Sequence, residues 1–546
     1  MENIYLDIGW NKNIPSSITP QYNRIADNLR KDFVNFIKTL SIPFGDNLDW
    51  WISGPTSRNT LTNPLYHYCC SLVLIKNLIK QDEFFYDGVT VDSLALYHIL
   101  QEWFSKNNIK KNVIYIKNKK DRIKDRLSWL RVLLMFTRFI LVYLFIRLIN
   151  SKPNIENISI TLLDIYIFPG REEKDHYYPG LFEILNDNEK RFVYFVPAFF
   201  GFSLNGLISA IKILRKSGKN YLFKENYLHF SDYIYAFNFR KRVSKFKISS
   251  NEFKGFVMKP LILEELKSLS IYNQSIIGSI NCQFFWRLKN HRIKINRAIN
   301  WFENQPMSKG WNRGLNLYYP SALNIGYQAF ISSRHLMHLY PTEHEGSMNV
   351  LPKVICVTGK GLINEKREFF PQLNVKLSPA FRFQRVYEDI PSRKSKIVFN
   401  ILVTLYIDIY SSVSTLSLIN EAFSNFNDKS IIWSIKRHPG TPLKLIKSQL
   451  NFDCPEEWKW VDGDFHDLLN NVDLVVASAS STCMESLARG VPVIFNANKY
   501  GVNHNPIPQT ISPEIWRICY SIDDLITELK YFMNNNDEST PESTRA

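Results

Sequence analysis

The stretch from residue 473 to residue 496 constrains the fold of this chain more than any other. It reads DLVVASASSTCMESLARGVPVIFN. The apolar run DLVVA predicts a buried strand, the Ser/Thr turn SASST supplies helix caps, CMESLAR is helical, and Gly490 ends the helix before the strand VPVIF. Two buried strands joined through a helix are typical of a parallel sheet in an α/β fold.

The Ser/Thr turn predicts a binding site for a phosphate group. Backbone N–H groups, hydroxyl donors and the positive end of the helix dipole meet at such a turn. The sequence KRHP follows another apolar strand, SIIWSI, so His438 is expected at the same carboxyl edge of the sheet. A lone histidine is more often structural, but the proline after His438 fixes a turn beside the predicted phosphate site.

The residues around this stretch repeat the same pattern of strand and helix. From KIVFNILVTLY onward, five or more such units with short connections predict a Rossmann-like half. The segment DIPSRKSK is rich in proline, serine and charge, which favours a domain boundary. We therefore expect an N-terminal domain over 1–390, a C-terminal domain over 391–534 and a disordered acidic tail over 535–546.

The composition indicates a folded protein with an anionic partner. A chain of 546 residues, 45% of them hydrophobic, can form two or more domains. The net charge of +16 indicates nucleic acid, acidic lipid or a phosphorylated substrate, with a merely solvated basic surface as the alternative. Seven scattered cysteines without zinc spacing favour a reducing cytoplasm and no metal site. The start of the chain lacks a secretory signal, which favours a cytoplasmic protein.

The segment 119–152 predicts a membrane-associating insertion. It is strongly apolar from Leu127 to Ile149, basic at both ends, and interrupted by Arg131, Arg138 and Arg147. An arginine near the bilayer centre costs roughly 2.5–3.5 kcal/mol, so three arginines argue against a spanning helix. We expect an amphipathic helix, or a pair of helices, in the headgroup region of an anionic membrane. A buried core helix and a true span are the alternatives.

Three acidic residues are candidates for a general base. Glu303 follows an aromatic strand end, where apolar neighbours can raise its pKa toward neutrality, although a glutamate that caps the next helix is the alternative. Arg313 is expected to hold Glu303 or to meet an anionic acceptor. Glu343 and Glu345, in the later sequence PTEHEG, compete for the same role.

A polar cluster near the start of the chain is a further candidate for substrate binding. The run NLDWWIS predicts a short strand and GPTSRNT a turn after it. Ser57, Arg58 and Asn59 would then lie at the carboxyl end of a strand, where parallel sheets bind ligands. A polar turn without a function is the alternative.

The motifs together resemble those of a known group of enzymes. KRHP with SASSTCMESLARGVPVIF resembles the His-Pro and Ser/Thr motifs of bacterial sialyl-, polysialyl- and Kdo-type transferases of the GT-B architecture. WWIS with SRN, WFENQP, GWNRG and NIGYQ resemble a family of bacterial surface carbohydrate biosynthesis proteins. The resemblance implies an α/β fold of two Rossmann-like domains that face each other across a cleft, with the membrane-associating insertion in the first.

The resemblance also implies a reaction and its residues. A nonulosonic acid or Kdo would pass from a CMP-activated donor to a glycan or lipid-linked glycan of the capsule or lipopolysaccharide, at the inner face of the cytoplasmic membrane and without a metal or other cofactor. The acidic-acidic-glycine pattern of the family is not clean here, since Glu303 precedes Asn-Gln and Gly346 follows Glu345. The resemblance implies His438 for the nucleotide, Ser480, Ser481 and Thr482 for the phosphate, and Glu303 for the base. Further candidates for nucleotide and phosphate contacts are Lys436, Arg437, Pro439, Ser478 and Glu485, and candidates for substrate contacts are Ser57, Arg58, Asn59, Arg313 and Gln328.

Two other classes of function remain open at this point. One is a transferase or epimerase of the same architecture that uses UDP-sugars. The other is a non-catalytic assembly or nucleic-acid-binding protein, which would account for the basic charge. The sequence contains no nucleic-acid-binding motif, and its aromatic residues are not interleaved with basic ones as stacking platforms, so we do not expect a nucleic-acid partner.

Overall fold

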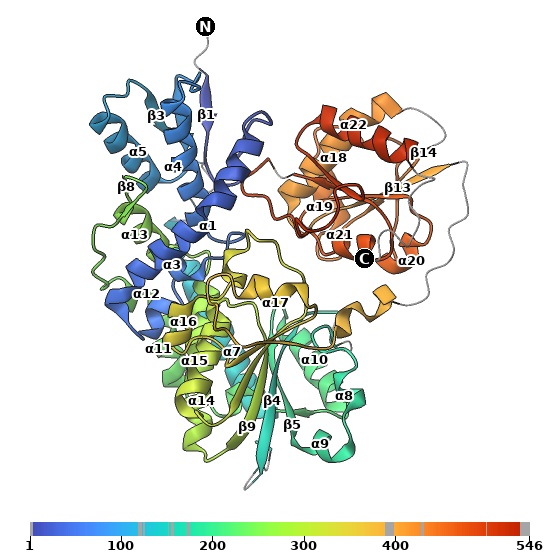
Figure 1. The fold of residues 1–546 in the computed structure, drawn as a ribbon. Coiled ribbons are helices and arrows are strands. Elements are labelled where there is room, and N and C mark those ends of the chain that lie inside the picture. Colours follow the sequence, from blue (N-terminus) through green and yellow to red (C-terminus); the bar gives the residue numbers. More distant parts are fainter. Residues whose placement is uncertain are drawn as a thin grey trace.

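The computed structural model describes residues 4–117, 126–150, 158–170, 175–387, 398–426, 431–497 and 499–535, together with residues 123, 152, 153, 155 and 172. In these residues the chain forms three parallel sheets and one antiparallel hairpin (Figure 1). The predicted boundary at 390–391 and the tail over 536–546 lie outside the described residues.

The C-terminal sheet has six parallel strands in the order β15-β14-β13-β16-β17-β18. Short helices connect the strands, and Asp408 caps the first of them by accepting a hydrogen bond from Ser411 N. This half therefore has the predicted Rossmann-like arrangement. The strands are β13 (Phe399–Thr404), β14 (Ile431–Lys436), β15 (Lys459–Trp460), β16 (Leu474–Ala477), β17 (Val493–Asn496) and β18 (Trp516–Cys519), and the helices are α18 (Ile409–Phe423), α19 (Leu443–Lys447), α20 (Phe465–Leu469), α21 (Thr482–Ala488) and α22 (Ile522–Asn534).

The central sheet has seven parallel strands in the order β12-β11-β10-β9-β4-β5-β6. The helices α14 (Tyr272–Asn290) and α15 (Pro306–Tyr318) pack closely against each other. This sheet is the second Rossmann-like half of the predicted α/β fold. Its strands are β4 (Ser159–Ile167), β5 (Val193–Phe199), β6 (Asn220–Tyr221), β9 (Lys294–Trp301), β10 (Leu323–Gln328), β11 (Val354–Val357) and β12 (Val375–Leu377).

A third, three-stranded sheet occupies the start of the chain, with β1 (Tyr5–Asp7), β2 (Gly88–Val91) and β3 (Asn112–Tyr115). The sequence did not predict it as a separate sheet. The strand predicted for NLDWWIS is wrong, because this run forms the helix α2 (Leu48–Trp51). The Asn47 side chain caps α2 by accepting a hydrogen bond from Asp49 N, and both tryptophans are buried in the core.

Helices connect the three-stranded sheet to the central sheet. They include α1 (Thr19–Ser41), α3 (Gly54–Ser57), α4 (Leu65–Lys80) and α5 (Leu94–Lys106) early in the chain, and α11 (Phe230–Phe237), α12 (Phe239–Val243) and α13 (Lys259–Lys267) later. One apolar core contains residues of both groups together with α14 and α15. These helices therefore tie the two sheets together.

The apolar part of the predicted insertion forms one helix, α7 (Ser128–Ile149). Of the described helices it alone is long and apolar enough to cross a membrane. Only Tyr143 and Ile146 are buried, whereas Trp129 is 63% and Leu148 84% exposed. α7 is therefore not a buried core helix, and an apolar side of it is uncovered.

Candidate functional site

The two motifs of the C-terminal half lie on one edge of its sheet. The strand register aligns Lys436 at the end of β14 with Thr404 at the end of β13, and Thr404 with Ala477 at the end of β16. Adjacent strands are about 4.8 Å apart, so the His-Pro turn and the Ser/Thr turn begin about 10 Å from each other. The segment after β13 passes between them.

Hydroxyl groups organise the start of α21. Thr482 Oγ1 lies 3.1 Å from Thr404 Oγ1, and Ser480 Oγ accepts a hydrogen bond from Thr482 N. Ser481 Oγ donates to Glu485 Oε1 at 2.8 Å. Ser480, Ser481 and Thr482 are half-exposed. The turn therefore presents hydroxyl and backbone donors at the sheet edge, as a phosphate site requires.

Glu485 has a partner that the sequence did not indicate. His466 Nε2, from α20, lies 3.1 Å from Glu485 Oε2. The carboxylate thus connects Ser481 to a histidine from a separate helix. The sequence FHDLLNN does not indicate that its histidine belongs to a site, because His466 reaches Glu485 only through the packing of α20 beside α21.

The basic residues before His438 do not point toward the Ser/Thr turn. Lys436 Nζ donates to Gly463 O at 2.6 Å, and Arg437 lies 3.7 Å from Asp462. Both partners follow β15, on the opposite side of β14 from β13. The predicted phosphate role of these two side chains is therefore not supported by their positions. His438 itself closes the turn, since its Nδ1 accepts from Gly440 N at 3.0 Å, and Pro439 is exposed.

A cavity of about 210 Å³ opens at the same edge of the C-terminal sheet. Its C-terminal wall consists of the segments after β13, β16 and β17, and its other wall comes from the start of the chain. Ser478 and Asn496 line it, and Ser478 Oγ is buried without a hydrogen-bond partner. The residues from the start of the chain are Trp10, Asn11, Thr60, Leu61 and His67.

Two buried histidines of this cavity are held neutral. Burial lowers the pKa of His67 to about 4 and that of His504 to about 3. His504 Nε2 lies 2.9 Å from Thr60 Oγ1, and His67 Nδ1 lies 2.7 Å from the Tyr22 hydroxyl. The two rings therefore add hydrogen-bonding groups to the cavity without adding charge at neutral pH.

A second cavity, of about 420 Å³, separates the central sheet from the C-terminal half. One wall comes from the segments after β10 and β11, including Ser332, Thr358 and Gly359, and from the helix η4 (Phe381–Tyr387). The other wall comes from Met484 and Glu485 of α21 and from residues 505–510. The carboxyl edge of the central sheet thus faces α21 across a cleft, which confirms the predicted arrangement of two Rossmann-like halves.

Glu303 follows β9 at this edge of the central sheet. Its carboxylate accepts hydrogen bonds from Trp301 Nε1 at 2.9 Å and from Gln305 Nε2 at 2.5 Å. Burial raises its pKa, while these hydrogen bonds and the charge of Arg382 partly oppose the shift. The geometry supports a base at this position, because Glu303 is only half-buried and its pKa is moved toward neutrality.

Glu345 is not available as a base. It is 1% exposed, and its carboxylate lies 2.7 Å from Arg58 Nη2 and 2.9 Å from Lys309 Nζ. Burial alone would raise its pKa, but the charges of Arg58 and Lys309 lower it to about 2. An ionised carboxylate held by two buried cations maintains the structure and cannot meet an acceptor.

Glu343 lies on the same short helix, α16 (Glu343–Ser347), and is exposed. The next residue on this helix, His344, packs against Trp51 of α2. α16 is therefore part of the contact with the N-terminal helices, and Glu303 is the best placed of the three acidic candidates.

The predicted substrate contacts in the N-terminal half are mostly structural. Ser57, Arg58 and Asn59 are buried, and the Arg58 guanidinium donates to two backbone carbonyls besides Glu345. Arg313 pairs with Asp46 at 2.6 Å rather than with Glu303. Gln328 is buried at the end of β10, and neither its amide oxygen nor its nitrogen has a partner. Among the described residues, no group of three or more potential metal ligands occurs.

No protein-family model and no curated protein matches this sequence. Similar solved structures cover 71% of the chain. They include an S. aureus MnaA–UDP co-structure (TM-score 0.42, 9% identity, 92% of that chain) and CalG4, the calicheamicin glycosyltransferase (TM-score 0.40, 10% identity, 92% of that chain). Another is the Methanocaldococcus jannaschii UDP-GlcNAc 2-epimerase with UDP-GlcNAc and UDP (TM-score 0.37, 11% identity, 98% of that chain). Likeness at this level identifies neither a substrate nor a reaction.

Proposed function

We propose that the protein is a glycosyltransferase that uses a nucleotide-sugar donor. The observation that carries this proposal is the cleft between the central sheet and α21. The hydroxyl-rich turn lies at the start of α21, and Glu303, a carboxylate of raised pKa, follows β9 at the carboxyl edge of the central sheet. Ligands of doubly wound folds bind at the carboxyl ends of the strands. A reaction between a donor phosphate and an acceptor hydroxyl needs an anion site and a base in this relation.

In the proposed reaction, the acceptor oxygen forms a bond to the anomeric carbon of the donor sugar. The bond between that carbon and the phosphate oxygen breaks, and the nucleotide leaves with the electron pair. Ser480, Ser481 and Thr482 stabilise the phosphate charge as it grows, and His438 contacts the nucleotide from the neighbouring turn. Glu303 takes the proton of the acceptor hydroxyl. These donors act on the phosphate without a metal.

Two classes of donor fit this proposal. A CMP-activated nonulosonic acid or Kdo is supported by the resemblance of the His-Pro and Ser/Thr motifs. A UDP-sugar is the second candidate, and the solved structures named above that contain a nucleotide contain UDP. An epimerase acting on a UDP-sugar would use the same cleft without an acceptor.

We further propose that the enzyme acts at the cytoplasmic face of an anionic membrane. The exposed apolar side chains of α7, among them Trp129, Leu134 and Leu148, support this location, and the exposed Arg131 and Arg138 would meet anionic headgroups. The acceptor would be a glycan or a lipid-linked glycan of the cell surface.

The test is a donor screen on purified protein with matched variants. CMP and UDP release from their sugars is measured with a lipid-linked glycan extract as acceptor. Ser481→Ala and His438→Ala are expected to lower kcat/KM by at least tenfold, whereas Ser448→Ala, at an exposed serine of the same domain, leaves it unchanged. Full transfer by both site variants would refute the proposed phosphate site. Conversion of a UDP-sugar without acceptor would identify the epimerase.

A further inference from the structure

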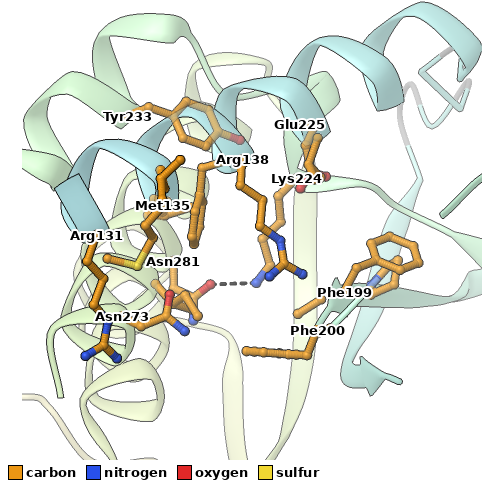
Figure 2. Close-up of a pocket in the computed structure, with 18 residues that line it drawn as sticks. Arg131, Met135, Arg138, Phe199, Phe200, Lys224, Glu225, Tyr233, Asn273 and Asn281 are labelled. Atoms are coloured by element: carbon orange, nitrogen blue, oxygen red, sulfur yellow. Dashed lines mark hydrogen bonds between the residues drawn. The ribbon is translucent and has the colours of Figure 1, made fainter. Parts of the chain in front are cut away.

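A cavity of about 440 Å³ lies beneath α7, beside the carboxyl end of β5 in the central sheet. Figure 2 shows side chains of α7 above the cavity and those of β5, η2 (Lys224–Asn226) and α14 around it. Its size is within the range of pockets that bind small molecules. No residue of the proposed transfer reaction lines it.

The cavity has an apolar wall and a polar floor. The wall consists of Leu134, Met135, Phe139 and Val142 of α7, with Phe199, Ile277 and Ile280 opposite. The floor consists of Lys224, Glu225, Asn273 and Asn281. A ligand that fills this space must be amphiphilic. A purely polar molecule would lose hydrogen bonds against the apolar wall, and a hydrocarbon would leave the polar groups of the floor without hydrogen-bond partners.

Lys224 favours a ligand with a negative charge. The residue is 7% exposed, and its amine donates one hydrogen bond, to Asn281 Oδ1 at 2.6 Å, marked by the dashed line in Figure 2. No hydrogen bond to a carboxylate is formed by this amine among the described residues, although the charges of Glu225 and Asp164 act on it. An ammonium has three donors, so two of them are available to a ligand. A buried cation of this kind is stabilised by an anion that enters the cavity.

Two further groups fit an anionic head that carries hydroxyls. Glu225 Oε2 is buried without a hydrogen-bond partner and can accept a hydrogen bond from a hydroxyl of the head; burial raises the pKa of this carboxyl, and the charge of Lys224 opposes the shift. Arg131 and Arg138, which also line the cavity, are exposed on α7 and add positive charge at its mouth. The charge of the lining is therefore complementary to an anionic head.

The apolar wall continues onto the outer surface of α7. Leu134 lines the cavity and is 62% exposed, and Leu133 and Leu148 on the same helix are 50% and 84% exposed. A hydrocarbon chain whose head lies at Lys224 can thus leave the protein past Leu134, between the exposed side chains of Arg131 and Arg138. This continuity indicates a lipid rather than a free phosphate or sugar.

We propose that the cavity beneath α7 binds a lipid with an anionic head, the head at Lys224 and Asn281 and the chain along α7. The strand register pairs Phe199 of β5 with Ile167 of β4. It also pairs Leu163 of β4 with Ile299 of β9, so four residues further on, Glu303 falls level with Ile167 and Phe199. With about 4.8 Å between strands, Glu303 lies about 10 Å along the sheet edge from the cavity. A role of this lipid as the acceptor rests on the proposed transferase function, but its binding does not.

The experiment measures binding of dodecyl phosphate to the full chain by titration calorimetry, below the micellar concentration and without any nucleotide sugar. We expect one molecule per chain. Lys224→Met removes a charge-assisted contact and is expected to weaken binding about 10- to 100-fold. Ala198→Leu places extra carbon atoms in the cavity and weakens binding without removing a charge. Lys216→Met, at an exposed lysine of α10 (Leu204–Lys216), leaves binding unchanged.

Each comparison can overturn the proposal. Equal affinity of the wild type and Lys224→Met, or of the wild type and Ala198→Leu, would exclude this cavity. Inorganic phosphate that binds as tightly as dodecyl phosphate would exclude a lipid, and dodecyl maltoside that binds equally well would exclude recognition of the anion. If Lys224→Met does not fold, Ala198→Leu and the two ligand controls decide the question. Because no donor is present, failure here leaves the transferase proposal standing.

Discussion

Replacing Glu345 by glutamine separates a structural carboxylate from a catalytic one. Glu345 lies 2.7 Å from Arg58 and 2.9 Å from Lys309, and all three side chains are buried. Glutamine keeps the shape but leaves two buried cations without their counter-charge. Removal of one partner from a buried ion pair costs about 3–5 kcal/mol, so the variant should be strongly destabilised.

The pKa of Glu345 gives an independent magnitude. Arg58 and Lys309 lower it from 4.5 to about 2 against the effect of burial. One pKa unit corresponds to about 1.4 kcal/mol, so ionisation of this carboxyl contributes about 3 kcal/mol of stability at neutral pH. Because the folded-state pKa is depressed, this contribution is complete above pH 4.5 and is lost as the pH falls toward 2.

The assay is thermal unfolding at several pH values. At neutral pH, a loss of about 3–5 kcal/mol from a domain of about 390 residues should lower the Tm by roughly 4–6 °C, and the difference from the wild type should shrink as the pH falls below about 4.5. Glu343→Gln, an exposed change on the same helix, should stay within about 0.5 kcal/mol of the wild type. An unchanged Tm of Glu345→Gln would refute the reasoning, and an unchanged Tm with lost transfer would make Glu345 the base.

Further variants test other parts of the structure. Glu303→Gln is expected to retain the wild-type Tm and lose at least a hundredfold in kcat, and normal transfer rates would remove Glu303 from the reaction. Gly310→Ala should unfold the protein or lower its stability by about 3 kcal/mol, measured by urea titration, because its Cβ would lie 1.9 Å from Gly278 O where α14 meets α15. Trp129→Ser with Leu148→Ser should reduce flotation with anionic vesicles, and unchanged flotation would show that α7 does not contact the membrane.

The C-terminal half was predictable because its signals are local. KIVFNILVTLY and DLVVA are continuous apolar runs, short turns follow them, and Asp408, Asp464 and Ser521 cap α18, α20 and α22, so neighbouring residues determine most of the strands and helices. The parallel order then brings His438 and the Ser/Thr turn to one edge by the usual rule for such sheets. No contact between distant segments was needed for either conclusion.

The N-terminal half was less predictable because distant residues decide it. DWW has the composition of a strand, yet the cap at Asn47 and the surrounding core make it a helix. Glu345 looked like Glu303 in the sequence, and its contacts with Lys309 and with Arg58, 287 positions away, make it structural. The same holds for His504, whose partner Thr60 is 444 positions distant.

Residues from both ends of the chain line the cavity of about 210 Å³ at the edge of the C-terminal sheet, which affects how a donor could bind there. Its walls come from the C-terminal sheet and from the start of the chain, and Asn503 N donates to Asn23 Oδ1 as a second link between them. The central sheet contributes to the other cavity, opposite α21. A nucleotide at the sheet edge would therefore contact the start of the chain, and the sugar beyond the phosphate would extend toward Glu303. Ser478 and Ala479 line the first cavity and Met484 and Glu485 the second, so the Ser/Thr turn between them is placed to serve both parts of the proposed donor.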